Sequence, residues 1–354
     1  MTTAQPTFAE QIEAASDAET LQVAVLIPCH NEAATIAKVV ADFRSALPGA
    51  LVVVGDNGST DGTTAIASEA GALVVEEPLL GKGNAVRRLF ADIEADVYLL
   101  VDGDDTYDPT AAPALVQRLV ADNLDMVNGR RVIASAEDYR RGHRFGNSLL
   151  TEIVGRIFGS RFEDMLSGYR VFSRRFVKTF PARSSGFEIE TELTVHALEM
   201  RMPVAELPTS YTDRPADSDS KLHTFRDGWR ILRTIGALLR EEHPLRFFGG
   251  VAVVMTLASM ALAMPLLIEY AESGLLPRIP TAVLASTIML GAFVSFAVGL
   301  ILETVTRGRQ ELKRIHYLAF PCVRREMPSG HWGAPSADGK PLRLTPLHPA
   351  KTRR

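Results

Sequence analysis

The stretch from residue 97 to residue 109 reads VYLLVDGDDTYDP and joins an apolar run to a cluster of aspartates. The run VYLLV is typical of a parallel strand that helices cover on both faces. The carboxylates follow at the carboxyl end of this strand, where open α/β sheets bind their ligands. Because unpaired carboxylates would repel one another, we expect Asp102 and Asp104 to hold a divalent cation. The alternative is a solvated acidic turn, and we expect Asp108 to cap the next helix in that way.

The composition indicates a protein with a membrane-embedded part. The chain has 354 residues, of which 46% are hydrophobic, and its mean hydropathy of +0.07 is high for a wholly soluble protein. The net charge of −4 gives no indication of nucleic-acid binding. Cys29 and Cys322 lie far apart, which argues against a disulfide framework and for a reducing compartment. The acidic N-terminal segment has no long apolar run, so we expect no cleavable signal peptide.

Strand-like and helix-like segments alternate in the first third of the chain. We expect strands at residues 22–28, 50–55, 73–75, 97–101 and 125–127, and helices at residues 33–47, 61–70, 84–95 and 109–123. This βαβ spacing predicts a mostly parallel, doubly wound sheet. After residue 140 the pattern is less regular, with a helix expected at residues 187–200 and a strand at 204–211.

Two long segments, residues 247–268 and 280–302, contain no charged side chain. Each reaches the roughly 20 apolar residues that cross a bilayer core, so we expect two transmembrane helices. Basic residues precede the first and follow the second, and the positive-inside rule therefore places the N-terminal domain and the tail in the cytoplasm. Residues 221–240 combine an apolar face with arginines elsewhere. They are interpreted as an interfacial basic helix or, alternatively, as a surface helix of the soluble domain.

Polar loops follow the first three expected strands. PCHNE at residues 28–32 offers a carboxylate and an amide to a ribose or base edge. DNGSTDGT at residues 56–63 offers polar side chains to a uracil or guanine. GKG at residues 81–83 would bring backbone and positive charge beside a diphosphate. It is not a P-loop, because the upstream glycine and the Ser or Thr after the lysine are missing.

The ordered set PCHNE, GDNGSTDGT, GKGNAVR, DGD, NGRR and DMLSGYR resembles the family 2 glycosyltransferases with the GT-A fold. More narrowly, it resembles the polyprenyl-phosphate glycosyltransferases, which include dolichyl-phosphate mannose synthase and the bactoprenol glucosyltransferases. The resemblance covers roughly residues 20–240. It implies a Rossmann-like doubly wound sheet followed by an interfacial amphipathic helix and two transmembrane helices. It also implies inverting transfer of a sugar from a UDP- or GDP-linked donor to undecaprenyl or dolichyl phosphate, with Mg²⁺ or Mn²⁺.

The resemblance assigns roles to individual residues of this chain. The nucleotide-binding positions are Pro28, Asn31, Glu32, Asp56, Asn57, Lys82 and Asp102. The metal ligands are Asp102 and Asp104, and the catalytic residues are Asp104, Asp164 and Arg131. The acceptor-phosphate residues are Arg131, Arg170, Arg214, Ser220 and Lys221.

The charge of the acceptor decides what the site must supply. A phosphomonoester has its second pKa near 6 and is already a nucleophile at neutral pH, so positive charge matters more than a strong base. Asp164 matches a residue proposed as base in related enzymes, but it could equally orient an arginine. The chain departs from the family at Asn57, where a second aspartate is usual, and at Thr106, where a glutamine is common. The Gln-x-x-Arg-Trp motif of processive synthases is absent from the sequence, which favours single transfer.

The expected organisation follows from these segments. It consists of an N-terminal segment 1–20, a catalytic domain 21–215, a juxtamembrane amphipathic helix 216–246, two transmembrane helices 247–302 and a basic cytoplasmic tail 303–354. We expect an integral protein of a bacterial inner membrane whose partners are a nucleotide sugar and a polyprenyl phosphate, with no nucleic acid. A stripe of small residues, Gly291, Ser295 and Gly299, would suit contact with the other span or with a second protomer in a homo-oligomer.

Two other functions compete with polyprenyl-phosphate glycosylation. The first keeps the enzyme but changes the acceptor to a hydroxyl of a glycolipid or cell-surface polysaccharide, which would need a true general base. The second is a non-catalytic membrane scaffold, which predicts loss of the charged loops. The chain retains DGD and the arginines, so the sequence disfavours the scaffold.

Overall fold

The computed structural model describes residues 21–133, 151–152, 154–157, 159, 162–212, 224–275 and 278–323. The chain divides into two compact units. The first comprises Met1–Gly228 together with Tyr317–Arg354, and the second is Trp229–His316. The N-terminal segment and the tail from residue 324 lie outside the described residues. The predicted domain boundaries therefore stay predictions.

The first unit is built around a seven-stranded sheet with the order β3-β2-β1-β4-β6-β5-β7. Its strands are β1 (Val23–Cys29), β2 (Leu51–Asp56), β3 (Leu73–Glu76), β4 (Val97–Leu100), β5 (Met126–Ile133), β6 (Arg170–Ser173) and β7 (Val204–Tyr211). β3, β2, β1 and β4 pair in parallel, as do β5 and β7. The expected mostly parallel, doubly wound sheet is confirmed. β6 was not predicted, and it runs antiparallel to both β4 and β5.

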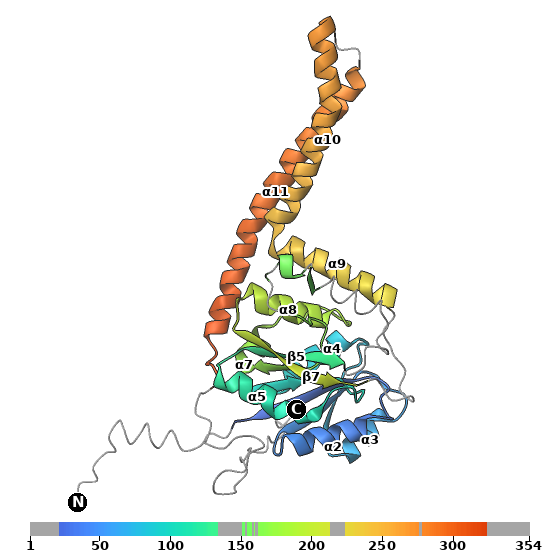
Figure 1. Cartoon of the computed structure of the whole chain (residues 1–354), viewed down its shortest axis with the longest axis vertical. Helices are drawn as coiled ribbons and strands as arrows, with labels where there is room; N and C mark the ends of the chain where they lie inside the picture. The colour runs from blue at the N-terminus through green and yellow to red at the C-terminus, as the bar shows by residue number, and fades with distance from the viewer. Residues whose placement is uncertain are drawn as a thin grey trace, which may run out of the picture. The chain divides into compact units, whose positions relative to one another are not determined.

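Helices cover both faces of this sheet (Figure 1). One face carries α2 (Ile36–Ala46), α3 (Thr63–Glu69) and α5 (Ala112–Ala121). The other carries α4 (Lys82–Asp92), α7 (Arg174–Thr179) and α8 (Ile189–Glu199). A 3₁₀ turn, Pro109–Ala111, precedes α5, and Asp108 Oδ1 accepts its Thr110 N–H at 2.9 Å. The expected cap at Asp108 is confirmed.

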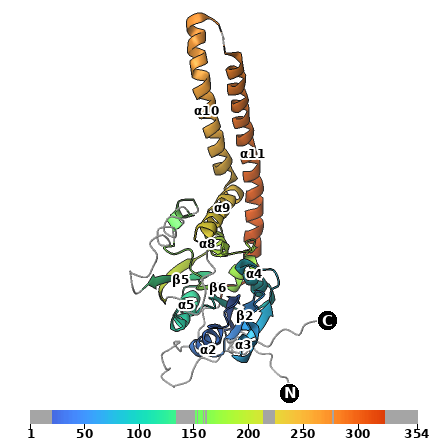
Figure 2. The same ribbon diagram turned by 90° about the vertical axis from the view of Figure 1, so that its right-hand side faces the viewer.

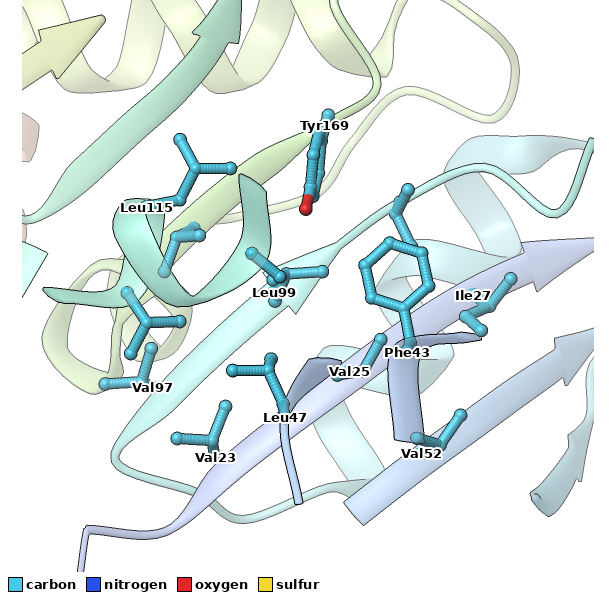
Figure 3. Close-up of a cluster of buried hydrophobic side chains, with 14 of the residues drawn as sticks. Val23, Val25, Ile27, Phe43, Leu47, Val52, Val97, Leu99, Leu115 and Tyr169 are labelled. Carbon is cyan, nitrogen blue, oxygen red and sulfur yellow. The ribbon is translucent and has the colours of Figure 1, made fainter. Parts of the chain in front are cut away.

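The alternation of side chains along β1 explains why the sheet has a core on each face. Val23, Val25 and Ile27 pack on one side with Phe43 of α2 (Figure 3), whereas Leu26 belongs to the cluster on the other side. Successive strand residues point to opposite faces, so a fully apolar strand fits only between two layers of helices. Burying each such side chain contributes about 1.5–3 kcal/mol. The buried strand β1 thus holds its carboxyl end, and the polar loop that follows it, in a defined position next to the end of β2.

The second unit consists mainly of three helices, α9 (Thr224–Glu242), α10 (Pro244–Ser273) and α11 (Ile279–Leu318). α10 and α11 run side by side in both views (Figures 1 and 2), and both are long and apolar enough to cross a membrane. Apart from Pro244 at the start of α10, their buried positions recur every seven residues: Ala252, Ser259 and Leu266 in α10, and Ala285, Ala292, Gly299 and Thr306 in α11. A seven-residue spacing is the pattern of a coiled-coil seam.

The stripe of small residues in α11 lies against α10 of the same chain. Ser295 Oγ donates to Phe248 O at 3.0 Å, and Ser259 Oγ of α10 donates to Ala285 O at 2.8 Å. Of the two expected partners for this stripe, the other span and a second protomer, the structure shows contact with the other span. Large apolar side chains elsewhere on the pair remain exposed, such as Val254 at 66% and Phe293 at 67%. This is the distribution expected of helices whose solvent is lipid.

Candidate active site

The loops after β1 and β2 are tied to each other at the carboxyl edge of the sheet. Asn31, with a left-handed φ of 53°, donates its backbone N–H to Ser59 Oγ at 2.9 Å, and its Oδ1 accepts the Thr60 N–H at 2.7 Å. Glu32 N–H donates to Thr63 Oγ1 at 2.9 Å. The predicted residues Asn31 and Glu32 thus lie beside the second polar loop. Pro28 lies in β1, paired in register with Gly55 of β2.

Asp56 and Asn57, the last residue of β2 and its neighbour, differ in how their side chains are used. Asp56 is 5% exposed; Oδ2 accepts the Ser59 N–H at 3.2 Å, whereas the buried Oδ1 has no hydrogen-bond partner within the described part of the chain. Asn57 directs its amide to the loop after β3, with Nδ2 donating to Leu79 O at 2.7 Å. Asp56 therefore has an oxygen that can accept a hydrogen bond from a ligand, whereas the side chain of Asn57 is bonded to the protein backbone.

Lys82, the first residue of α4, links two carboxylates from distant parts of the sequence. Its Nζ lies 2.5 Å from Asp102 Oδ1 and 2.5 Å from Glu190 Oε1. Burial opposes the charge of the ammonium, but the two carboxylates outweigh it and raise the pKa of Lys82 above its ordinary value. Lys82 is thus a fixed cation at the end of β4. No sequence motif assigned Glu190 to this site, so the contact was not predicted.

The GKG turn differs from its expected use in one respect. Close backbone approach does occur, but the Gly83 N–H donates to Ser185 O at 3.0 Å. This backbone donor therefore faces a protein carbonyl. The positive charge that we expected from the turn is supplied by the Lys82 side chain, which reaches Asp102.

Asp102 and Asp104 occupy the turn after β4 as expected. A Cβ at Gly168 would meet the Asp102 carboxylate, so the glycine lets the DMLSGYR loop approach Asp102 without displacing that side chain. Asp104 is 3% exposed, and its Oδ1 accepts a hydrogen bond from Thr106 Oγ1 at 2.6 Å. Thr106 therefore orients a carboxylate of the DGD turn.

The carboxylates at this turn are suitable ligands for a hard divalent ion whose other ligands come from water and a substrate. Within the described ranges, no group of three His, Cys, Asp or Glu side chains is arranged to hold a metal by itself. Mg²⁺ is often bound by one or two carboxylates and takes its remaining ligands from water and substrate phosphates. Asp102 and Asp104 meet that requirement, whereas a self-contained protein cage is not present among these residues.

Arg131 in β5 and Asp164 in the segment before β6 form a bidentate ion pair. Arg131 Nε and Nη2 donate to the two Asp164 oxygens at 2.7 and 2.8 Å, and the Arg131 backbone N–H adds a bond at 3.2 Å. The guanidinium also lies over the Tyr211 ring, 5.5 Å from its centroid. Of the two roles left open for Asp164, this geometry is the one in which the carboxylate orients an arginine.

Arg170 is buried and serves the loop before β6. It is 0% exposed; Nε donates to Ser167 O at 2.9 Å, Nη1 donates to Thr194 Oγ1 at 2.9 Å and Nη2 donates to Met165 O. These bonds direct every nitrogen of the guanidinium to a protein oxygen. The structure therefore does not support the predicted contact of Arg170 with an acceptor phosphate. Arg214, Ser220 and Lys221, the other predicted phosphate contacts, lie outside the described residues.

Comparisons with known proteins agree on one family. The family model described as Glycosyl transferase family 2 matches residues 24–180. Glycosyltransferase AglJ of Haloferax volcanii is 34% identical over 298 residues, which cover 84% of this chain and 98% of that protein. The dolichyl-phosphate hexose transferase of the same organism is 29% identical over 221 residues, covering 62% of this chain and 95% of that protein.

A solved structure resembles the fold. Glucosyl-3-phosphoglycerate synthase from Mycobacterium tuberculosis, crystallised in complex with uridine diphosphate, matches with a TM-score of 0.52 and 21% identity. The match covers 67% of this chain and 86% of that chain. At this identity the comparison concerns the architecture of the sheet and its helices.

Proposed function

The chain belongs to glycosyltransferase family 2 and has the predicted GT-A fold, and from this premise we propose that it transfers a sugar from a nucleotide sugar to the phosphate of a membrane polyprenol. One observation carries the proposal. The same chain has an acidic edge that fits a metal-bound diphosphate and two helices long and apolar enough to cross a bilayer. The relative named dolichyl-phosphate hexose transferase supports the choice of acceptor.

The donor half of the site would be formed by the segments that follow β1, β2, β3 and β4. Asp56 Oδ1 is a buried acceptor that can take an N–H of the base. Asp102 and Asp104 would hold Mg²⁺ or Mn²⁺, which when bound supplies positive charge to the diphosphate leaving group. Lys82 adds a second positive charge beside Asp102. Pro28, Asn31 and Glu32 would contact the nucleoside through the loop that they form.

The acceptor half would use Arg131 to bring the lipid phosphate to the sugar. A phosphomonoester is mostly dianionic at neutral pH, so its oxygen attacks the anomeric carbon without first losing a proton. Asp164 holds Arg131 with both oxygens and is proposed as an orienting group instead of a base. Attack from the face opposite the leaving group gives inversion at the anomeric carbon. Arg214, Ser220 and Lys221 are proposed as further phosphate contacts.

The membrane arrangement follows from the charges that flank the two spans. The positive-inside rule would place the catalytic unit and the C-terminal tail on the cytoplasmic side, in a bacterial inner membrane. The prenyl chain would then stay in the bilayer while its phosphate reaches the catalytic unit. Each buried CH₂ of the lipid contributes about 0.8 kcal/mol, so chain length would act on the acceptor KM.

The test is transfer of labelled sugar by the purified full chain in detergent. UDP-glucose, UDP-N-acetylglucosamine, UDP-glucuronic acid and GDP-mannose are each supplied with Mn²⁺ or Mg²⁺ and undecaprenyl phosphate. We expect an organic-extractable labelled lipid from at least one donor, dependent on the divalent ion, and none when undecaprenol without its phosphate replaces the acceptor. Transfer to a glycolipid hydroxyl, but not to undecaprenyl phosphate, would move the function to the rival acceptor class.

A further inference from the structure

The side-chain amide of Asn57 is hydrogen-bonded to the loop that joins β3 to α4. Nδ2 donates to the carbonyl oxygens of Glu77 at 3.0 Å and Leu79 at 2.7 Å, and Oδ1 accepts the Gly81 N–H at 2.5 Å. The residue is 3% exposed. Both donors of the amide and its oxygen are therefore bonded to backbone groups inside the protein.

This pattern of bonds requires an amide. An aspartate at position 57 would keep an acceptor for the Gly81 N–H, but it has no proton to give to the carbonyls of Glu77 and Leu79. Its charge would also face two carbonyl oxygens at hydrogen-bond distance, which is unfavourable in a buried position. The asparagine is thus matched to the loop between residues 77 and 81, and that loop explains why the chain has no second aspartate here.

The clamped loop leads directly into Lys82. Gly81 has a φ of 127°, and a Cβ there would collide with Ser185 O. The Gly83 N–H donates to the same oxygen, so the turn is held by Asn57 on one side and by Ser185 on the other. The backbone from which the Lys82 side chain extends to Asp102 is therefore held by contacts within the protein.

We propose that Asn57 is a positioning residue that acts through the loop 77–81 to hold Lys82 beside Asp102, and that it does not read the base. The inference rests on the proposed function, because Lys82 is the cation assigned there to the diphosphate. Asp56, whose Oδ1 has no partner among the described residues, remains for the base. The two neighbours thus contribute to different parts of the nucleotide.

Binding measurements separate these contributions. Calorimetry with Mn²⁺ compares the affinity of the full chain for pyrophosphate with its affinity for UDP or GDP, whichever binds more tightly. For Asn57→Asp we expect the Kd of the nucleotide and of pyrophosphate to rise by the same factor, about tenfold. The matched substitution at the neighbouring position, Asp56→Asn, should raise the Kd of the nucleotide and leave the Kd of pyrophosphate unchanged. Asn57→Asp should also raise the donor KM and leave the acceptor KM unaltered.

Hydrogen exchange tests the clamp without any ligand. In the nucleotide-free full chain, peptides that span residues 77–84 should exchange faster in Asn57→Ala and in Asn57→Asp than in wild type, and Asp56→Asn should not change them. Asn57→Asp keeps the bond to the Gly81 N–H and carries the test if the alanine variant does not fold. Wild-type protein that binds no nucleotide would defeat the proposed function, whereas the exchange rates would still decide the clamp. Unchanged exchange of residues 77–84 in the Asn57 variants would overturn the positioning role of Asn57. Weaker nucleotide binding with unaltered pyrophosphate binding in Asn57→Asp would also overturn it.

Discussion

Lys82 and Arg131 are both cations at the carboxyl edge of the sheet, and carboxylates hold them in different ways. Lys82 lies between two carboxylates, those of Asp102 and Glu190. Arg131 donates hydrogen bonds to both oxygens of one carboxylate, that of Asp164, and lies over the ring of Tyr211. The ammonium can serve two partners at once because it is a point charge, whereas the planar guanidinium matches a single carboxylate.

This difference shows which part of the reaction each cation suits. At Lys82 the carboxylates of Asp102, Asp104 and Glu190 exceed the positive charge, so the region favours an additional cation such as a divalent ion. At Arg131 the guanidinium is already oriented, and an incoming phosphate can approach a fixed positive charge. The first arrangement suits the donor diphosphate and the second suits the acceptor phosphate. Substitutions at the carboxylates on each side test this division.

The largest effect should come from Asp104→Ala. The variant removes one of the two carboxylates proposed to bind the metal, and we expect kcat to fall by about a thousandfold or more, since metal stabilisation of a leaving group is worth several kcal/mol. Sugar transfer to lipid is the measurement. Asp108→Ala is the matched control, because Asp108 caps the 3₁₀ turn before α5 and is not one of the carboxylates proposed to bind the metal. Equal activity of both variants would remove Asp104 from the donor site.

Asp164→Asn should have the next largest effect. Asparagine keeps one oxygen for Arg131 but loses the charge, so we expect the acceptor KM to rise and kcat/KM to fall about 10- to 100-fold. If the carboxylate only orients Arg131, the pH profile of kcat should keep its shape. A larger fall in kcat, with residual activity that lacks the acidic limb of the wild-type profile, would instead identify Asp164 as a base, and with it a hydroxyl acceptor.

Glu190→Gln should have a smaller effect. The amide can still accept a hydrogen bond from Lys82, but the ammonium then has one charged partner in place of two. We expect kcat/KM for the donor to fall about tenfold and the acceptor KM to stay constant, because a single charged contact is weakened. Glu192→Gln is a useful comparison, since Glu192 accepts backbone N–H groups of Arg183 and Ser184 instead of contacting Lys82. Similar donor kinetics in the two variants would count against a specific role for Glu190.

The sequence predicted the parts of this molecule that depend on local pattern. The apolar runs of β1, β2 and β4 and the loops after them lie where their residues indicated, because a parallel strand buried on both faces is apolar throughout. β6 escaped prediction because it lies outside the regular βαβ alternation and is defined by antiparallel partners far away in the chain. No local pattern carries that information.

The roles of Arg131, Arg170 and Glu190 could not be separated from sequence. Both arginines follow polar or aromatic residues in short motifs, but burial directs Arg170 to carbonyl oxygens and leaves Arg131 with Asp164. Glu190 lies in α8, in which nearly every residue is buried, so the helix shows no polar face from which the site could be inferred. Tertiary packing, which the sequence does not display locally, decides each of these cases.

Tyr107→Phe should have the smallest effect, and it tests a residue that contacts both Gly168 and Tyr211. The Tyr107 oxygen accepts the N–H of Gly168, beside Asp102, at 2.8 Å, and its ring lies 5.2 Å from that of Tyr211, beneath Arg131. Phenylalanine leaves one buried N–H without its acceptor, at a cost of about 1–3 kcal/mol. We expect a fewfold loss of kcat with both KM values nearly unchanged, because neither cation loses a charged partner.

The ionisation of Tyr107 gives this variant a second measurement. Burial raises the pKa of Tyr107 above its ordinary value near 10. As the pH rises through about 10 the unfolded chain therefore loses this proton first, so the stability that the neutral phenol contributes is complete below that pH and is lost above it. The melting temperature of wild type should fall between pH 9 and about 11 more steeply than that of Tyr107→Phe, which has no phenol to ionise. Parallel curves would mean that Tyr107 titrates normally in the folded protein, and the packed connection between the donor and acceptor sides would then be looser than the structure indicates.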